Sequence, residues 1–100
     1  MIKIEFLKSK NKVIALDNNI LVGECEFIIN NDIWNIVHTY VDEIYRGTGV
    51  AKRLIIFVID EAKKNNKKVV ADCSYAKKIL MDRQLYISQV SIDKFYEKVW

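Results

Sequence analysis

The first part of the chain, up to Val41, alternates apolar and polar residues, a pattern typical of β-strands with one face turned towards a core. The alternation predicts four strands, at residues 2–7, 12–17, 21–30 and 33–41. The connections between them are short and polar, as in Asp17-Asn18-Asn19. Because short connections join antiparallel neighbours, we expect this part to form an antiparallel meander.

The second part changes period. From Gly49 to about Asn65 the apolar residues recur with helical spacing and cover more than one side, so we expect a helix packed on the sheet. Residues 69–73 follow as a short buried strand. A strand, a helix and a strand in this order predict a parallel crossover that places 69–73 beside 33–41. The predicted fold class is α+β, with a mixed, mostly antiparallel sheet and helices packed on it.

Two further segments have helical features. Ser74 is a candidate cap of a second helix that runs to about Asp82. Ser91 precedes a third amphipathic segment. The apolar residues that share one face of this segment are Ile92, Phe95, Tyr96 and Val99. Residues 83–90 show no clear pattern.

Composition limits the class of protein. The chain has 100 residues, 51% of them hydrophobic and 29% charged, which suits one globular domain over residues 1–100. The longest apolar run, Leu54 to Ile59, is far shorter than the roughly twenty residues of a membrane span. The chain opens as a strand and contains only 2 cysteines, so we expect a cytoplasmic protein with no membrane association. A net charge of +3 suits an anionic cofactor as well as a nucleic acid.

The turn between the predicted strand and helix carries the strongest functional signal. It reads Arg46-Gly47-Thr48-Gly49-Val50-Ala51 and contains two of the chain's 3 glycines. Glycine lets the backbone turn tightly and approach a ligand closely. A helix that begins at such a turn directs unpaired N–H groups and its positive dipole end outward, which favours phosphate. The nucleotide P-loop requires Gly-Lys-Ser/Thr, and this chain lacks it. The dinucleotide fingerprint requires a third Gly or Ala where Lys52 stands.

A meander followed by a strand, an Arg-x-x-Gly-x-Ala turn, a helix and a parallel strand resembles the GNAT superfamily of N-acetyltransferases. Arg46, Gly49 and Ala51 occupy the positions of the family's pyrophosphate signature, and the resemblance covers roughly residues 20–82. The short length, His38 before the turn and Cys73-Ser74-Tyr75 after the next strand resemble a branch of very small GNAT-like proteins.

The resemblance implies an acetyl-CoA-dependent N-acetyltransferase, with coenzyme A held along the turn and between the splayed strands 36–41 and 69–73. The implied cofactor-binding residues are Tyr40, Val41, Arg46, Gly47, Thr48, Gly49, Val50, Ala51, Lys52, Cys73 and Tyr75. The thioester is expected near Cys73 and His38, the candidate catalytic residues.

Acetyl transfer requires a neutral amine, a polarised carbonyl and a protonated leaving thiolate. His38, the only histidine, suits the role of base, and the pattern places it on one strand face with Ile36 and Tyr40. It is equally typical of a partly buried structural histidine. Cys73 precedes a helix N-terminus, a setting that favours a reactive thiol. It can carry the acetyl group, protonate the thiolate or only line the channel.

Other residues have open alternatives. Arg46 is either a phosphate partner or a stabiliser of the turn, and Lys52 and Arg53 can reach a phosphate or remain solvated. Tyr75 can donate a proton or pack with Tyr40. Cys25 is expected in the core, and core or edge packing is the expectation for Trp34 and Trp100. No His, Cys, Asp or Glu residues have zinc-site spacing, so we expect no metal.

The resemblance therefore implies acetyl transfer to a primary amine, on a protein lysine or N-terminus or on a polyamine-like molecule. A non-catalytic acyl-CoA sensor is the first alternative, because the acid and base candidates are few. A small basic nucleic-acid-binding module is the second, although the basic residues are dispersed and we expect no nucleic-acid partner. The edge strand 2–7 leaves both a monomer and a weak homodimer open.

Overall fold

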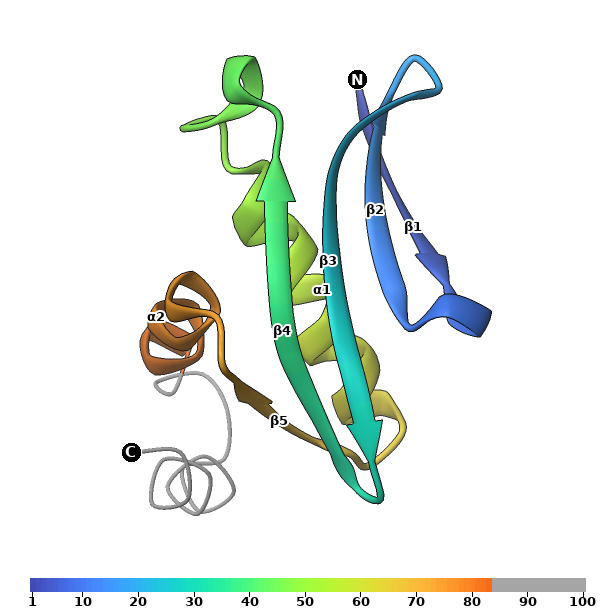
Figure 1. Ribbon diagram of the computed structural model, residues 1–100, viewed down its shortest axis with the longest axis vertical. Coiled ribbons are helices and arrows are strands. Elements are labelled where there is room, and N and C mark those ends of the chain that lie inside the picture. The colour runs from blue at the N-terminus through green and yellow to red at the C-terminus, as the bar shows by residue number, and fades with distance from the viewer. Residues whose placement is uncertain (84–100) are drawn as a thin grey trace.

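The computed structural model describes residues 1–83. Within this range it contains one five-stranded sheet and two α-helices (Figure 1). The patternless stretch from residue 84, the amphipathic segment after Ser91 and Trp100 lie outside the described residues.

The sheet runs in sequence order. Its strands are β1 (Ile2–Leu7), β2 (Lys12–Asp17), β3 (Ile20–Asn30), β4 (Ile33–Val41) and β5 (Lys68–Ala71). The first four are antiparallel neighbours, and β5 lies parallel to β4, as the pattern predicted. Asparagines with positive φ, such as Asn18 and Asn31, stand in the turns, where the left-handed conformation reverses the chain.

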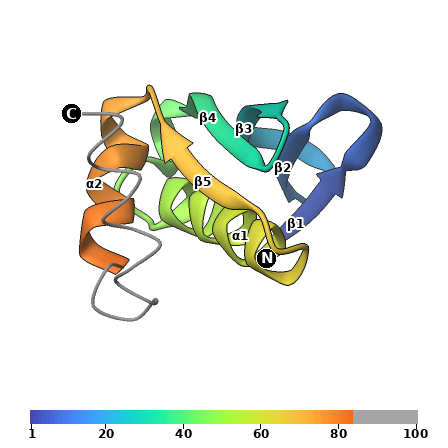
Figure 2. The ribbon, with the colours of Figure 1, turned by 90° about the horizontal axis from the view of Figure 1, so that it is seen from below.

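The two helices predicted within residues 1–83 are present. Helix α1 (Val50–Lys64) covers one face of the sheet, and α2 (Ser74–Arg83) lies beyond β5, next to β4 (Figure 2). The first helical bond of α2 runs from the Lys77 amide to the Cys73 carbonyl, so Cys73 rather than Ser74 is the cap residue. Neither helix in the described part of the chain has the length and apolar character needed to cross a membrane.

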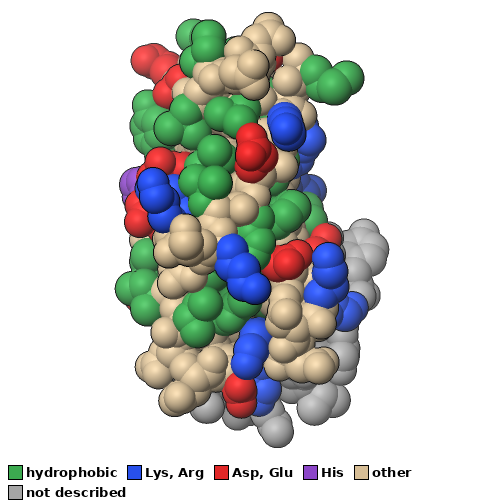
Figure 3. Space-filling view, turned by 90° about the vertical axis from the view of Figure 1, so that its right-hand side faces the viewer, with side chains coloured by type: hydrophobic (Ala, Val, Ile, Leu, Met, Phe, Trp, Pro, Cys, Tyr) green, Lys and Arg blue, Asp and Glu red, His purple; other side chains and the backbone are tan. Residues whose placement is uncertain are grey.

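The core lies between α1 and the sheet. Leu54, Ile55 and Val58 of α1 are fully buried against Cys25, Ile36 and other inward-facing strand residues. Trp34 is buried too and stacks on Phe27, with ring centroids 4.7 Å apart, so the packing role expected for this tryptophan is confirmed. On the face seen from the β1 side, basic and acidic side chains are interspersed with hydrophobic ones (Figure 3). That face therefore presents no continuous basic patch.

A β-bulge in β4 changes which side chains face the core. Phe27 pairs with Ile36 and Glu26 with His38, so Val37 has no partner on β3. Ile36 is fully buried, whereas His38 lies on the opposite, exposed face. The expectation that His38 shares a face with Ile36 was wrong, because simple alternation cannot anticipate an extra residue in one strand.

The two parallel strands pair over a short distance only. The ladder joins Ile33–Ile36 of β4 to β5, and the amides of Asp72 and Cys73 then both donate to the Ile36 carbonyl. Strand β5 ends at Ala71, two residues before the predicted end, and the chain turns away from β4 (Figure 1). The part of β4 after Ile36 therefore has no strand partner on this side among the described residues.

Candidate active site

A cleft opens where β4 and β5 separate. It has a volume of about 570 Å³ and lies between the end of β4, the turn before α1 and the first turn of α2. Its lining comprises Thr39, Tyr40, Val41, Tyr45, Arg46, Gly47, Gly49, Val50, Ala51, Lys52 and Tyr75. The cleft thus joins the stretch from Thr39 to Lys52 with Tyr75, which lies more than twenty residues further along the chain.

The glycine turn forms the end of this cleft at α1. Gly47 and Gly49 have φ of 82° and 89°, a left-handed conformation that side chains with a Cβ adopt only at a cost. A Cβ added to either glycine would meet no atom within 4 Å, so conformation rather than crowding calls for glycine here. Gly49 caps α1 without a side-chain hydrogen bond. The first amides of the helix are therefore available to an anionic group in the open space.

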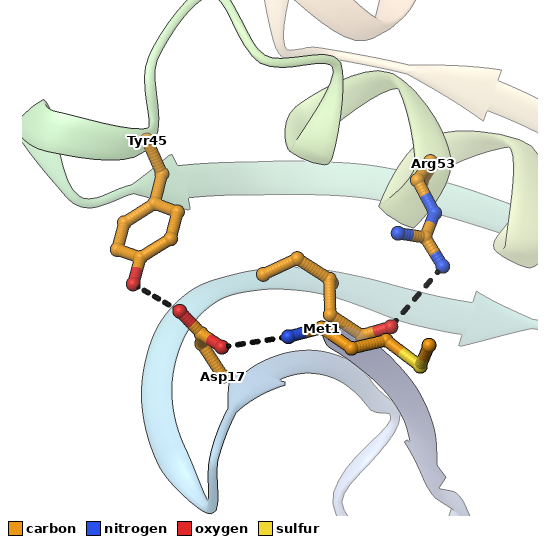
Figure 4. A network of polar contacts seen from close by, with 5 residues as sticks. Met1, Asp17, Tyr45 and Arg53 are labelled. Carbon is orange, nitrogen blue, oxygen red and sulfur yellow. Dashed lines mark hydrogen bonds and ion pairs between the residues drawn. The ribbon is translucent and has the colours of Figure 1, made fainter.

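Side chains around the turn hold its shape. The Nε of Arg46 donates to the Val41 carbonyl at 3.1 Å, and the Thr48 hydroxyl donates to the Tyr45 carbonyl. Of the two roles expected for Arg46, the structure shows the stabilisation of the turn. Arg53 points elsewhere, because its Nη2 donates to the Ile2 carbonyl of β1 at 3.4 Å (Figure 4).

Tyr45 connects the cleft to the meander. Its hydroxyl donates to Asp17 Oδ2, and the Met1 ammonium lies 3.2 Å from Asp17 Oδ1 (Figure 4). The Tyr45 hydrogen bond, followed by that of the ammonium, lowers the pKa of Asp17. The same bond raises the pKa of Tyr45. This contact fixes a cleft-lining ring to the end of β2.

Thr39 joins the two cysteines on the core side of β4. Its hydroxyl donates to Cys25 Sγ at 3.7 Å and accepts from Cys73 Sγ at 3.9 Å. Burial raises the pKa of the Cys25 thiol to about 11, which suits the core role expected for it. Cys73 is only partly buried and lies between β5 and α2. It is therefore the thiol with access to the surroundings of the cleft.

The structure brings most of the predicted cofactor residues together. Thr48 and Cys73 are the two that do not line the cleft. Thr39 and Tyr45 do line it and escaped the sequence reasoning. Tyr45 stands one residue before the signature, but no local pattern reveals that its hydroxyl reaches Asp17. Thr39 gives no signal at all, because its place depends on the bulge at Val37.

The two candidate catalytic residues lie on opposite sides of the sheet. Cys73 reaches Thr39 on the core side, whereas His38 projects from the exposed face with Glu24 and Glu26. One ligand atom from each of these three outer residues lies within 4.8 Å of the others. The expectation of no metal was based on linear spacing, which does not detect residues that meet across two strands.

Comparison with known proteins identifies the family. A model of the GCN5-related N-acetyltransferase family matches residues 12–90. The solution structure of a GCN5-like protein from Staphylococcus aureus is 34% identical, covers 84% of this chain and 82% of its own, and has a TM-score of 0.65.

Two larger proteins share part of this fold. A Bacillus anthracis protein assigned as a streptothricin acetyltransferase, solved with acetyl coenzyme A, is 31% identical over 66% of this chain and 40% of its own, with a TM-score of 0.57. A ribosomal-protein-alanine N-acetyltransferase from Brucella melitensis is 27% identical over 65% of this chain and 52% of its own, with the same TM-score of 0.57. The chain thus spans about half or less of these two proteins.

These matches confirm the expected family, fold class and class of enzyme. The chain belongs to the GCN5-related N-acetyltransferase family.

Proposed function

We propose that this protein transfers an acetyl group from acetyl-CoA to a primary amine, and that the cofactor lies in the cleft between β4 and β5. The observation that carries the proposal is the glycine turn, whose left-handed residues leave open space before the first amides of α1. Amides and a helix dipole aimed at one point favour a diphosphate. The Bacillus anthracis relative contains acetyl coenzyme A.

The separation of β4 from β5 supports the placement of the pantetheine arm. Beyond Ile36 the edge of β4 has no strand partner among the described residues, so an extended amide-containing chain can pair with it. Tyr40 and Tyr75 line the same cleft and offer ring surface to the arm. Lys52, in the first turn of α1, adds positive charge near the diphosphate position.

The acid–base groups divide between the two sides of β4. Bound acetyl-CoA supplies the thioester to be attacked. A lysine-like amine has a pKa near 10.4 and needs a base at neutral pH. In the proposal, His38 accepts this proton, and Glu24 and Glu26 beside it attract the cationic acceptor. Cys73, held by Thr39, is the donor to the leaving thiolate.

A matched pair of variants tests the cofactor site. Thr48 is exposed within the turn and borders the cleft without lining it, so Thr48→Glu adds a negative charge close to the expected diphosphate, and Thr48→Gln adds similar volume without charge. Two like charges about 6 Å apart repel by about 2.8 kcal/mol at an effective dielectric constant of about 20. Calorimetric titration should show acetyl-CoA binding at least about tenfold weaker in Thr48→Glu than in Thr48→Gln, with a gap that narrows in salt.

Equal affinity of the two variants, or no saturable binding by the wild type, would refute this placement of the cofactor. Folding is checked by thermal melting, because both variants lose the same hydroxyl bond to the Tyr45 carbonyl.

A non-catalytic acyl-CoA sensor is the second candidate. The observation that favours it is the placement of His38 and Cys73 on opposite sides of the sheet. Release of free coenzyme A thiol in the presence of a panel of amines separates the two functions. An enzyme releases thiol in proportion to acceptor, whereas a sensor binds acetyl-CoA and releases none.

A further inference from the structure

Three side chains with metal-binding atoms meet on the exposed face of the sheet, away from α1 and outside the cleft lining. Glu24 and Glu26 are two residues apart on β3, which places both on one face. His38 lies directly opposite Glu26 on β4. One carboxylate oxygen from each glutamate and one imidazole nitrogen all lie within 4.8 Å of one another.

We propose that Glu24, Glu26 and His38 form a binding site for one divalent transition-metal ion, of which Zn²⁺ best fits the ligand set. Imidazole nitrogen and carboxylate oxygen are both ordinary Zn²⁺ ligands, and three protein ligands leave a fourth position for water or another ligand. At Zn²⁺–ligand distances of about 2.1 Å, tetrahedral ligand atoms lie about 3.4 Å apart. Glutamate side chains reach this separation by small rotations about their χ angles.

The bulge at Val37 is the structural cause of the site. Without the extra residue, alternation along β4 would turn His38 to the core side, where Ile36 lies. With it, the imidazole stands in register with Glu26. Bulges commonly redirect a side chain at functional positions. The ligands also come from two paired strands, which hold them more rigidly than a loop would.

The charge balance around the cluster favours a cation. Among the described residues, Glu26 and His38 form no ion pair and no side-chain hydrogen bond, whereas Glu24 lies 3.6 Å from Lys12 Nζ. Of the two close carboxylates, only that of Glu24 therefore has an ammonium beside it. An ion at this site would neutralise the second carboxylate and compete with Lys12 for the first.

Metal binding would also affect the reaction, if the proposed function is right. An imidazole nitrogen that binds a metal has no lone pair for a proton, so His38 cannot then serve as base. The ion would therefore inhibit acetyl transfer without displacing acetyl-CoA from the cleft. Metal binding itself does not depend on the proposed function, and a direct binding measurement keeps the two ideas separate.

The test is a Zn²⁺ titration of the whole protein, by calorimetry and by competition with a chromogenic chelator. Loss of a hydrogen-bond partner of a metal ligand typically costs 10–100-fold in affinity. Loss of a direct ligand in Glu26→Gln or His38→Gln should therefore weaken Zn²⁺ binding by more than about tenfold. Cys73→Ser is the matched control for binding by a thiol and should leave the affinity unchanged. Lys12→Gln should tighten binding, because it removes the competing ammonium.

A second measurement reports on the ligand directly. The chain contains one histidine, so its imidazole resonances in a nitrogen-correlated NMR spectrum belong to His38. They should shift or broaden with one equivalent of Zn²⁺ or Co²⁺, and should not respond to Mg²⁺. Unmoved resonances, equal Zn²⁺ affinity in Glu26→Gln, loss of binding in Cys73→Ser, or no tightening in Lys12→Gln would each overturn the three-ligand site.

Discussion

The strands of the meander and those of the β4–α1–β5 unit share one sheet but differ in how completely they pair. Every residue of β1 pairs with β2, and β2 pairs with β3 from Lys12 to Asp17. In contrast, β5 pairs only with the first four residues of β4 and then diverges. Each meander strand thus pairs with a neighbour along its full length, which favours stability, and the outer edge of β1 has no strand partner among the described residues. The β4–α1–β5 unit leaves an edge of β4 open, and that is where the cleft forms.

Two glycines show the same contrast at the level of single atoms. A Cβ on Gly23 of β3 would lie 3.1 Å from the Tyr40 carbonyl oxygen and 3.3 Å from Leu54 Cδ1. Close packing between β3, β4 and α1 favours glycine there. A Cβ on Gly49 would meet nothing, and glycine is required by its φ of 89°. The first glycine serves the core, and the second serves an open turn.

The largest expected effect is the loss of an aromatic side chain from the core. Phe27 of β3 is buried, stacks on Trp34 and lies 6.1 Å from the ring of Phe6. Phe27→Ala should lower the free energy of unfolding by about 3–5 kcal/mol, because it removes the buried ring and leaves a cavity. Urea denaturation measures this change.

We expect the lower stability of Phe27→Ala to leave the structure of the glycine turn unchanged. Acetyl-CoA affinity, measured where the variant remains folded, should match the wild type. A large drop in affinity without loss of stability would show that the core and the cleft are not separable in this way.

The two cysteines should differ in reactivity, because one lies in the core and the other near the cleft. Cys25 is fully buried, with its pKa raised to about 11 from an ordinary value of 9.0, whereas Cys73 is partly exposed. Each unit of pKa changes the thiolate fraction tenfold, so Cys25 should alkylate at least about 100-fold more slowly than a free thiol. Mass spectrometry of the native protein after iodoacetamide should find the label on Cys73. Comparable labelling of both sites would contradict the buried position of Cys25.

The raised pKa of Cys25 also makes the folding stability depend on pH in the alkaline range. Below pH 9 the thiol is neutral in the folded and unfolded states, and its contribution to stability is complete. Between about pH 9 and 11 it ionises in the unfolded chain only, so stability falls as the pH rises. Cys25→Ala should lack this part of the loss of stability at alkaline pH.

A smaller effect is expected from Gly49→Ala. A left-handed residue with a Cβ costs roughly 1–2 kcal/mol, and folding stability should fall by about that amount. Acetyl-CoA binding should weaken as well, since the new methyl group occupies the open space of the turn. Chemical denaturation and calorimetry measure the two effects. Undiminished stability would show that the turn adopts another conformation.

Much of the fold follows from the chain's periodicity. The bounds of β1, β2 and β4 and the parallel placement of β5 agree with the pattern, because alternation and short polar turns are local signals. The early end of β5 was missed, since divergence of two strands depends on what leaves the sheet next. The short signature at residues 46–51 sufficed to locate the glycine turn.

The chemistry around the cleft was less predictable for the same physical reason. The face of His38 depends on one extra residue, Val37, whose bulge is settled by pairing with β3 rather than by β4 itself. The contacts of Thr39 with both cysteines and of Tyr45 with Asp17 join residues far apart in the sequence. No local pattern contains such pairs.

The smallest expected effect concerns the hydrogen bond from the Tyr45 hydroxyl to Asp17, which links the turn to the meander. This hydrogen bond is the main cause of the lowered pKa of Asp17. A carboxyl whose pKa is lower in the folded state stabilises the protein above its ordinary pKa, near 3.8, and loses that contribution as the pH falls through the folded value. Tyr45→Phe should therefore be less stable than the wild type at neutral pH, and the difference should vanish in acid.

Because the ring also lines the cleft, acetyl-CoA affinity should fall slightly in Tyr45→Phe through a less fixed turn. Asp17→Asn, which lies outside the cleft, is the control: it should reproduce the loss of stability and the same small loss of affinity. If Asp17→Asn binds acetyl-CoA like the wild type while Tyr45→Phe does not, Tyr45 acts on the ligand directly and the meander does not position the turn.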